Sequence, residues 1–312
     1  MLIEKKDNWL VLVNPNAGAG KCRKEWVKIH SLLEKHLFKY EVVFTRKKYH
    51  AIVLTRQKIK DGYHKIIIVG GDGTLNEVIN GVFAQKQFPT TEITLGMIPV
   101  GSGNDWARMF DIPQDYDQAL QIIQKENTFI QDAGRVIFFN KNQKQGRYFI
   151  NIAGLGFDAI VTKRTNHLKE KGKRNKLIYF WSIIAGLFGY NHIQANLTID
   201  GVTYSHEIFS MNIGICRFSG GGMMQVPGAI PDDGKFDLTV IRKMRKFEVL
   251  RSLPVLYNGK ITKHKRVNTY IGEKIQVNSG KSIYLETDGE NLGHTPFEFE
   301  IIPKSVRIIT GI

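Results

Sequence analysis

The sequence has few cysteines, few acidic residues and no long apolar run. Its 312 residues include two cysteines, Cys22 and Cys216, which lie far apart and show no CxxC or zinc-ligand spacing. We therefore expect a reduced, intracellular protein without a structural zinc site. The longest uncharged apolar stretch, residues 177–190, is shorter than the roughly 20 residues that a membrane-spanning helix needs. The sequence thus predicts a protein that is soluble or peripheral to a membrane.

Acidic residues are outnumbered by basic ones. The chain holds 44 Lys and Arg against 29 Asp and Glu, a formal net charge of +15. This surplus favours an anionic partner, which is a nucleic acid, an anionic membrane or a phosphorylated ligand. We see no nucleic-acid recognition motif and expect no nucleic-acid partner. The N-terminal residues lack the apolar core of a signal peptide, so we predict a cytoplasmic location.

Short apolar segments alternate with helical patterns up to about residue 130. The expected strands are 9–13, 40–44, 66–69 and 93–98. The expected helices are 23–37, 51–60, 75–84, 105–110 and 116–124. This alternation predicts a mostly parallel, doubly wound sheet, in which ligands bind at the carboxyl ends of the strands.

The pattern becomes rich in strands from about residue 131. The expected strands are 136–139, 148–152, 193–199, 208–215, 236–241, 275–278, 283–286 and 297–302. Helical inserts are expected within 159–190 and near 247–257. The fold class that we predict is therefore an α/β domain followed by a β-rich domain.

A glycine-rich turn, Gly70-Gly71-Asp72-Gly73-Thr74, follows the apolar run 66–69 and precedes a helix. Glycines allow the backbone to approach a ligand closely, and a helix N-terminus attracts phosphate. The single carboxylate, Asp72, indicates a metal or an acid–base role. Thr74 and Glu77 also have capping-box spacing, so Thr74 has a purely structural alternative.

Two more glycine-containing loops follow predicted strands, at 14–20 and 99–105. The first departs from the P-loop pattern, because Pro15 replaces its first glycine and Cys22 replaces its Ser or Thr. Each loop alone is also explained by an ordinary turn. Three such loops at the ends of strands in one domain together predict a nucleotide or phosphate site.

Two turns in the second half of the sequence carry carboxylates, and each of these turns has two interpretations. Asp233-Gly234 precedes a strand and forms either a β-turn or a Mg²⁺ site, and by chemistry alone the turn is favoured. Asp288-Gly289-Glu290 follows a strand and forms either a hairpin turn or a source of a general base. The segment from Lys163 to Tyr190 joins basic residues to an aromatic helix, which suits either an anionic membrane surface or the protein core.

Taken together, these motifs resemble the diacylglycerol kinase catalytic family, and in particular its soluble bacterial lipid kinases. The resemblance covers nearly the whole chain and rests on five segments in order: 13–18, 70–77, 99–105, 220–234 and 287–290. GGDGT alone is shared with NAD kinases and 6-phosphofructokinases, whereas the ordered set is specific.

The resemblance implies a Rossmann-like nucleotide domain at residues 1–131, a β-sandwich domain at 132–304 and a return of 305–312 to the first domain, with the active site in the cleft between the domains. It implies that ATP is held by Asn14, Pro15, Asn16, Ala17, Gly18, Thr45, Gly71, Asp72, Gly73, Thr74, Leu75, Asn76, Glu77 and Ser102. Ser102 stands where threonine is commoner and keeps the hydroxyl.

The resemblance also supplies a metal site and a base. Asp233 matches the Mg²⁺ ligand, with backbone oxygens near Ile230 and Lys235, and this outweighs the turn reading. Glu290 matches the general base, with Asp288 beside it.

The implied function is an ATP- and Mg²⁺-dependent lipid kinase on a membrane surface, with diacylglycerol as the default substrate and other lipid alcohols open. The alternatives are an NAD kinase-like enzyme and a non-catalytic, nucleotide-dependent membrane-binding protein. Since members of this family dimerise, a homodimer is a further expectation.

Overall fold

The computed structural model describes residues 4–170 and 177–312. The chain divides into two compact units, one formed by residues up to Ala133 together with Lys304–Ile312, and the other by Gly134–Pro303. Among the described residues, no helix has both the length and the apolar character to cross a bilayer.

The first unit is built on a parallel sheet. Its strands follow the order β4 (Thr94–Pro99), β3 (Lys65–Gly70), β1 (Trp9–Val13) and β2 (Tyr40–Phe44). The end of β16 (Glu290–Ile309) adds in parallel beside β4, where Arg307 pairs with Thr94. Every residue of β1 is buried, as expected for a central strand that is covered on both faces.

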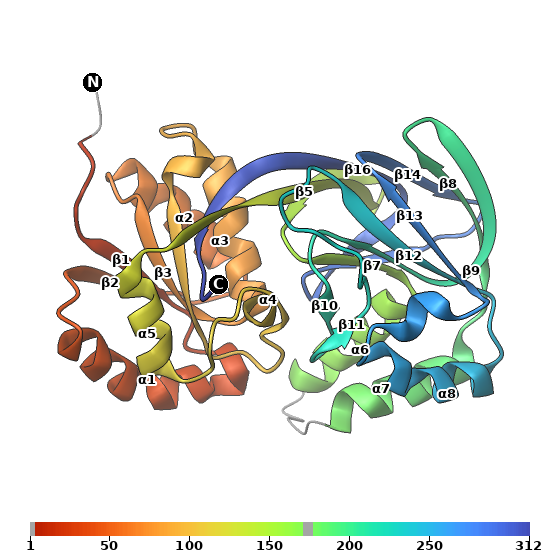
Figure 1. The fold of residues 1–312 in the computed structure, drawn as a ribbon, viewed down its shortest axis with the longest axis horizontal. Coiled ribbons are helices and arrows are strands. Elements are labelled where there is room, and N and C mark those ends of the chain that lie inside the picture. The colour runs from red at the N-terminus through yellow and green to blue at the C-terminus, as the bar shows by residue number, and fades with distance from the viewer. Residues whose placement is uncertain (1–3, 171–176) are drawn as a thin grey trace. The chain divides into compact units, whose positions relative to one another are not determined.

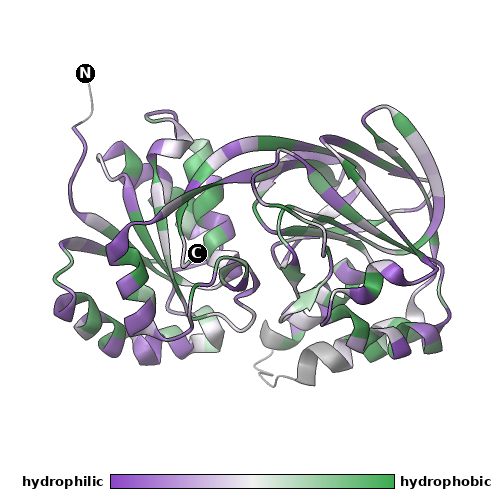
Figure 2. Cartoon of the chain, viewed as in Figure 1, coloured by the Kyte–Doolittle hydropathy of each residue, from purple (hydrophilic) through white to green (hydrophobic). Residues whose placement is uncertain are grey.

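Helices cover both faces of this sheet. They are α1 (Ala17–Lys35), α2 (His50–Lys60), α3 (Asp72–Ala84), α4 (Asp105–Met109) and α5 (Tyr116–Lys125), with a short 3₁₀ turn at Thr90–Glu92. In Figure 1, α1 and α5 lie on one side of the sheet, and α2 and α3 lie on the other. Apolar and polar residues alternate around α1 in Figure 2, as in a helix that buries one face.

The second unit is dominated by antiparallel strands. They are β5 (Thr128–Asn140), β6 (Gln143–Phe149), β7 (Ile152–Gly156), β8 (Ile193–Ile199), β9 (Val202–Gly214), β10 (Phe218–Ser219), β11 (Met223–Met224), β12 (Phe236–Arg242), β13 (Val267–Gly272), β14 (Lys274–Ser279), β15 (Tyr284–Thr287) and the first part of β16. The pairings β9–β7–β15–β16–β14–β8–β9 close on themselves, because the long strands β9 and β16 each bridge two layers.

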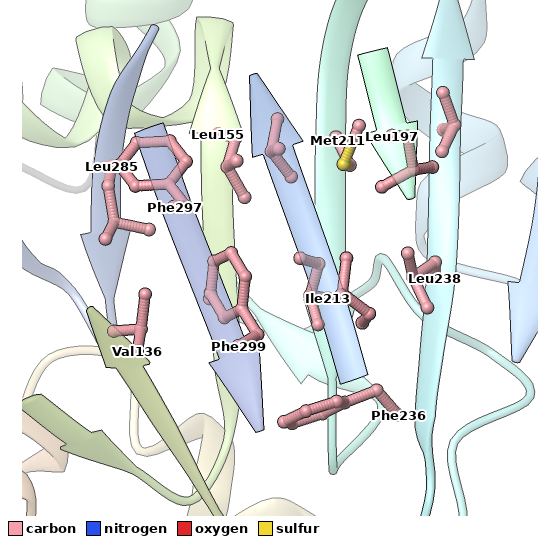
Figure 3. Close-up of a cluster of buried hydrophobic side chains, with 14 of the residues drawn as sticks. Val136, Leu155, Leu197, Met211, Ile213, Phe236, Leu238, Leu285, Phe297 and Phe299 are labelled. Atoms are coloured by element: carbon pink, nitrogen blue, oxygen red, sulfur yellow. The ribbon is translucent and has the colours of Figure 1, made fainter. Parts of the chain in front are cut away.

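The hydrophobic core of this unit lies inside that closed arrangement. Phe297 and Phe299 of β16 point inward together with Leu155, Ile213 and residues of neighbouring strands (Figure 3). Alternating inward positions along each strand supply these side chains, which is why the sequence shows period-two patterns here. The prediction of a mixed α/β unit followed by a β-rich unit is confirmed.

Three helices and a 3₁₀ turn accompany the second unit: α6 (Phe157–Glu170), α7 (Leu177–Gly189), α8 (Lys246–Leu256) and Lys260–Lys263. In the segment from Lys163 to Tyr190, Ile183 and Leu187 of α7 are buried, as the core reading predicts, whereas Trp181 and Phe188 are 61% and 76% exposed. Contact with a membrane surface stays a prediction. The basic residues in the middle of this segment, Lys171, Lys173, Arg174 and Lys176, lie outside the described residues.

Candidate active site

The loop after β1 is organised by Asn14. Its side-chain oxygen accepts the backbone N–H of Asn16 at 3.1 Å, and its Nδ2 donates to the Thr74 hydroxyl at 2.8 Å. Gly18, Ala19 and Gly20 then have φ values of 58°, 62° and 87°, so the regular part of α1 begins only after Gly20. Asn14 therefore ties the first predicted loop to the second.

Glycines let the other loops approach one another. A Cβ atom on Gly18 would lie 2.2 Å from the carbonyl oxygen of Val100, and one on Gly71 would lie 2.8 Å from the Cα of Gly101. Any side chain at these positions would push the loops apart. The three glycine loops that follow β1, β3 and β4 are thus brought together at one edge of the sheet, as the sequence predicts.

Asp72 links the second loop to the third. Its two carboxylate oxygens accept the backbone N–H groups of Asp105 and Trp106, at 3.3 and 3.2 Å. These are the first residues of α4, so Asp72 stabilises the start of that helix. Asn104 belongs to the predicted third loop but was not predicted as a site residue, and its buried side-chain oxygen has no hydrogen-bond partner among the described residues. Its place in a polar glycine loop was the only signal for it.

The capping-box reading of Thr74 and Glu77 is wrong. Gly71 is the N-cap of α3, and no side chain caps it. The Glu77 carboxylate instead accepts the backbone N–H groups of Tyr49 and Ala51, at 2.8 and 3.0 Å, at the start of α2. Glu77 therefore caps a neighbouring helix, which leaves the N-terminus of α3 without a side-chain cap in the described structure.

The remaining predicted residues of this unit differ in exposure. Thr45 follows β2, and its N–H donates to the carbonyl of Val13 at 2.9 Å, beside the first loop. Leu75 and Asn76 of α3 are 1% and 0% exposed, so their side chains are packed in the protein interior. Ser102 is exposed at the tip of the third loop. Pro15, Asn16 and Ala17 lie in the first loop, and Gly73 lies in the first turn of α3.

In the second unit, the turn between β15 and β16 carries both predicted catalytic carboxylates. Asp288 is buried and has a φ of 48°. Its carboxylate accepts three backbone N–H groups, those of Ile150, Asn151 and Ile152, at 3.1–3.2 Å. Glu290 begins β16 and is half-buried. Asp288 is therefore committed to holding the chain at the start of β7.

A second group of buried carboxylates lies next to this turn and was missed by sequence reasoning. Glu286 is 3% exposed and accepts the Gly289 N–H at 2.9 Å. Burial raises the pKa of the Glu286 carboxyl well above its ordinary value, the Gly289 hydrogen bond opposes this, and the charges of Asp158, Asp288 and Glu290 add to it. The sequence placed Glu286 at the end of the expected strand 283–286 and gave no signal that it belongs to a site.

Glu286 and Asp158 meet because Gly154 has no side chain. A Cβ there would lie 2.6 Å from Glu286 Oε1, 3.1 Å from Asp158 Cβ and 3.3 Å from Asn212 Oδ1. Asp158 accepts hydrogen bonds from the Ser210 hydroxyl and, at 3.1 Å, from Asn212 Nδ2. Burial raises the pKa of Asp158, and these two hydrogen bonds oppose the rise.

The predicted metal ligand Asp233 lies in an exposed turn. Its Oδ1 accepts the Lys235 N–H at 3.0 Å, so the β-turn reading describes the local geometry. Asp237 lies near it on β12. Burial, followed by the charge of Asp233, raises the pKa of Asp237 to about 6. The positive charge of Arg217 opposes this rise.

The residues at this turn fit Mg²⁺ as a partial ligand set. Mg²⁺ prefers oxygen ligands and commonly takes one or two carboxylates together with water and substrate phosphates. Asp233 and Asp237 are such carboxylates. In the described part of the chain, no group of three or more His, Cys, Asp or Glu side chains forms a site that would hold a metal without further ligands.

Two protein families match the two halves of the sequence. Residues 8–136 match the diacylglycerol kinase catalytic domain, and residues 151–310 match the YegS C-terminal NAD kinase beta sandwich-like domain. The diacylglycerol kinase of Staphylococcus carnosus is 26% identical over 96% of this chain and 94% of its own length. That of Staphylococcus aureus strain MRSA252 is 28% identical over 96% and 90%.

Solved structures share the fold. A diacylglycerol kinase from Bacillus anthracis superposes with a TM-score of 0.71 at 21% identity, covering 98% of this chain and 97% of that one. Yeast NADH kinase, solved with NADH, gives a TM-score of 0.55 at 13% identity and covers 98% and 84%. At these identities the likeness concerns the two-domain architecture.

Proposed function

The chain belongs to the diacylglycerol kinase catalytic-domain family, and on that premise we propose that it is a lipid kinase. It transfers the γ-phosphate of ATP to the hydroxyl of a membrane lipid, with diacylglycerol as the first candidate and phosphatidic acid as the product. Relatives named diacylglycerol kinase that align along almost the whole chain support this assignment. The single structural observation that carries it is the meeting of the three glycine loops.

We propose that these loops bind the triphosphate. Phosphoryl transfer depends on positioning and charge neutralisation more than on covalent chemistry. Backbone N–H groups at the uncapped start of α3 suit phosphate, and Asn14 and Asp72 keep the three loops in one arrangement. Residues 1–131 would then form a Rossmann-like nucleotide domain with 305–312, and 132–304 the lipid domain.

We propose Glu290 as the general base. Its carboxylate would accept the proton of the lipid hydroxyl as that oxygen attacks the γ-phosphorus. Asp288 would keep the turn in place through its three backbone hydrogen bonds. Asp233, with Asp237 and the carbonyls near Ile230 and Lys235, would hold Mg²⁺. When bound, that ion neutralises charge that develops on the phosphoryl oxygens.

We also propose peripheral attachment to an anionic membrane on the cytoplasmic side. Phe188 and Phe247 are 76% and 73% exposed, and the Lys246 ammonium lies 5.2 Å from the centre of the Phe188 ring. Exposed aromatic side chains beside basic ones suit an interface with anionic lipids. A homodimer remains a prediction from the family resemblance.

The decisive experiment is the transfer of labelled γ-phosphate from ATP, with Mg²⁺, into lipids in mixed micelles. The panel contains diacylglycerol, phosphatidylglycerol and a sphingoid base, with NAD as the soluble comparator. Label in a lipid establishes the reaction class and the acceptor. Label in NAD alone would replace the lipid kinase by an NAD kinase. ATP-dependent vesicle binding without transfer would make the protein a non-catalytic membrane-binding one.

Glu290→Gln tests the base, with Glu300→Gln on the exposed face of the same strand as the matched control. We expect Glu290→Gln to lower kcat by at least about 100-fold, in line with general-base catalysis, while ATP binding is kept. Turnover within a factor of two of the Glu300→Gln variant would remove Glu290 from this role.

A further inference from the structure

The turn that carries Glu290 is fastened to helix α6 by two asparagines. Asn166 of α6 donates from Nδ2 to the carbonyl oxygen of Gly289 at 3.0 Å and to Oδ1 of Asn291 at 3.3 Å. Asn291 donates from its own Nδ2 to the carbonyl oxygen of Ala159, in the first turn of α6, at 2.8 Å. Gly289 and Asn291 are the two neighbours of Glu290 in the chain. Helix α6 therefore holds the chain on both sides of Glu290.

The hydrogen bonds also fix the orientation of both side-chain amides. A backbone carbonyl oxygen only accepts hydrogen bonds, so the amide groups that face the carbonyls of Gly289 and Ala159 are the NH₂ ends. The oxygen end of Asn291 is then turned toward the NH₂ group of Asn166. We call this pair of side chains, Asn166 and Asn291, the asparagine clamp. An aspartate at either position would bring a carboxylate oxygen against a carbonyl oxygen, so the contact depends on the amides.

The clamp acts where packing does not hold the chain. Gly289 is exposed at the tip of the turn and has a φ of 84°. Its N–H donates to the buried Glu286 of β15 at 2.9 Å, and its carbonyl accepts from Asn166 of α6. Side chains from two elements thus hold both backbone polar groups of one exposed residue.

The face on which the clamp lies determines the direction of the neighbouring side chain. Asn291 stands opposite Glu286 in the pairing of β16 with β15, and Glu286 stands opposite Gly154 of β7. Helix α6 covers this face, because a Cβ atom on Gly154 would lie 3.1 Å from the Cβ of Asp158. Successive side chains of a strand point to opposite faces, so fixing the face of Asn291 fixes the direction in which Glu290 leaves the strand.

We propose that Asn166 and Asn291 are positioning residues for the general base, in that their paired amides hold the turn so that the Glu290 carboxylate meets the lipid hydroxyl. The inference rests on the proposed lipid kinase function and deepens it. A base must lie within hydrogen-bond reach of the proton that it takes, and a misplacement of about 1 Å can lower the rate about 100-fold. Glu290 is half-buried beside the exposed Gly289, so its place depends on the clamp.

Steady-state kinetics with the lipid that the wild type labels fastest provide the first test. Asn166→Ala removes both donated hydrogen bonds, and His167→Ala, at the exposed next position of α6, is the matched control. Alanine is the best helix former, so both variants keep α6. Asn166→Ala should lower kcat at least about tenfold and leave the KM for ATP within about a factor of two of the wild-type value, because the clamp lies away from the glycine loops in the sequence. A kcat equal to that of His167→Ala would overturn the proposal.

The second test asks whether Asn166 acts through Glu290. If it does, the two substitutions do not add, because Glu290→Gln already lacks the base that the clamp positions. Adding Asn166→Ala to Glu290→Gln should then change kcat by less than about twofold. The same loss of kcat in both backgrounds would give Asn166 a general structural role and overturn its positioning role.

The third test is independent of phosphate transfer. Hydrogen exchange followed by mass spectrometry reports the peptide that covers residues 287–292, without ATP. We expect at least about threefold faster exchange there in Asn166→Ala than in His167→Ala, since the turn loses two hydrogen bonds. Faster exchange in a protein that labels no lipid would keep the clamp and remove the kinase function. Transfer to a lipid by the wild type, with equal exchange in both variants, would keep the kinase function and remove the clamp.

Discussion

The carboxylate of Asp288 accepts the backbone N–H of Asn151 at 3.1 Å, across 137 positions of sequence. The same carboxylate accepts the N–H groups of the residues on either side, Ile150 and Ile152. One buried side chain thus joins the turn before β16 to the start of β7. Asp288 stands two residues before Glu290, and its carboxylate is occupied by these backbone hydrogen bonds.

We therefore predict that Asp288→Asn destabilises the second unit. The substitution replaces one accepting oxygen by an amide that donates, and it removes the charge that strengthens the remaining hydrogen bonds. Hydrogen bonds to charged groups contribute about 1.5–3 kcal/mol, so we expect a loss of about 2 kcal/mol in the free energy of unfolding. Urea unfolding followed by circular dichroism measures it. The exposed Asp61→Asn is the control, and equal stabilities of the two variants would contradict the bracing role.

A second prediction concerns Glu286 and pH. Burial raises its pKa in the folded protein above the value near 4.5 that it has when exposed. The folded state therefore binds the proton more tightly, and its stability falls as pH rises from about 4.5 through the raised pKa. Glu286→Gln keeps an oxygen for the Gly289 N–H and removes the ionisation. The variant should gain stability over the wild type as pH rises.

Urea unfolding at several values between pH 5 and pH 9 checks this prediction. We expect the difference in the free energy of unfolding between Glu286→Gln and the wild type to grow with pH in favour of the variant. Glu298→Gln, at an exposed position paired with Lys144 at 3.0 Å, is the control and should show a nearly constant difference. If the difference in the free energy of unfolding between Glu286→Gln and the wild type is also independent of pH, the folded protein does not hold Glu286 in its protonated form.

A third prediction concerns the closeness of the glycine loops. Gly18→Ala would place a Cβ atom 2.2 Å from the Val100 carbonyl oxygen at a φ of 58°, so the first and third loops must separate. The left-handed conformation alone costs a non-glycine residue roughly 1–2 kcal/mol. We expect the KM for ATP to rise at least about tenfold, with a smaller effect on the KM for lipid.

Gly280→Ala is the matched control, because an added Cβ atom there meets nothing within 4 Å. Steady-state kinetics at varied ATP and fixed lipid provide the measurement. If Gly18→Ala and Gly280→Ala show the same KM for ATP, the first loop lies away from the nucleotide.

A fourth prediction concerns membrane attachment. Phe247 on α8 is 73% exposed, and its ring would lose contact with water at a bilayer surface. Phe247→Ser should lower binding to phosphatidylglycerol-containing vesicles by about tenfold, since burying a large apolar side chain stabilises by roughly 1.5–3 kcal/mol. Sedimentation with vesicles measures it. Phe44→Ser, at a 43% exposed position on β2, should bind like the wild type. Equal losses in both variants would argue against α8 as the contact.

Much of the fold follows from local patterns in the sequence. The strands at 9–13 and 40–44 are found with the predicted bounds, and the run 66–69 lies within β3. β1 and β3 are short apolar segments whose β-branched side chains are buried on both faces, whereas β2 is a half-buried strand at the edge of the sheet. The three glycine loops were likewise placed by their position after strands, because a parallel sheet directs all those ends to one edge.

The partners of polar side chains were decided by the tertiary structure. Glu77 has capping-box spacing to Thr74, yet it caps α2, because α2 packs beside α3 and its N-terminus lies within reach. Glu286 and Asp158 show no spacing signal at all. They meet only because β15 and β7 are neighbours and Gly154, opposite Glu286, has no side chain.

The sequence by itself determined the order of elements, the positions of the glycine loops and the identity of the carboxylates at turns. These features depend on periods of two and 3.6 residues and on turn chemistry, which act over a few neighbouring residues. Only the tertiary structure decided which carboxylate braces the chain and which ones are buried beside one another. Those outcomes depend on pairing between strands that are more than a hundred residues apart, and no local pattern encodes which strands will be neighbours.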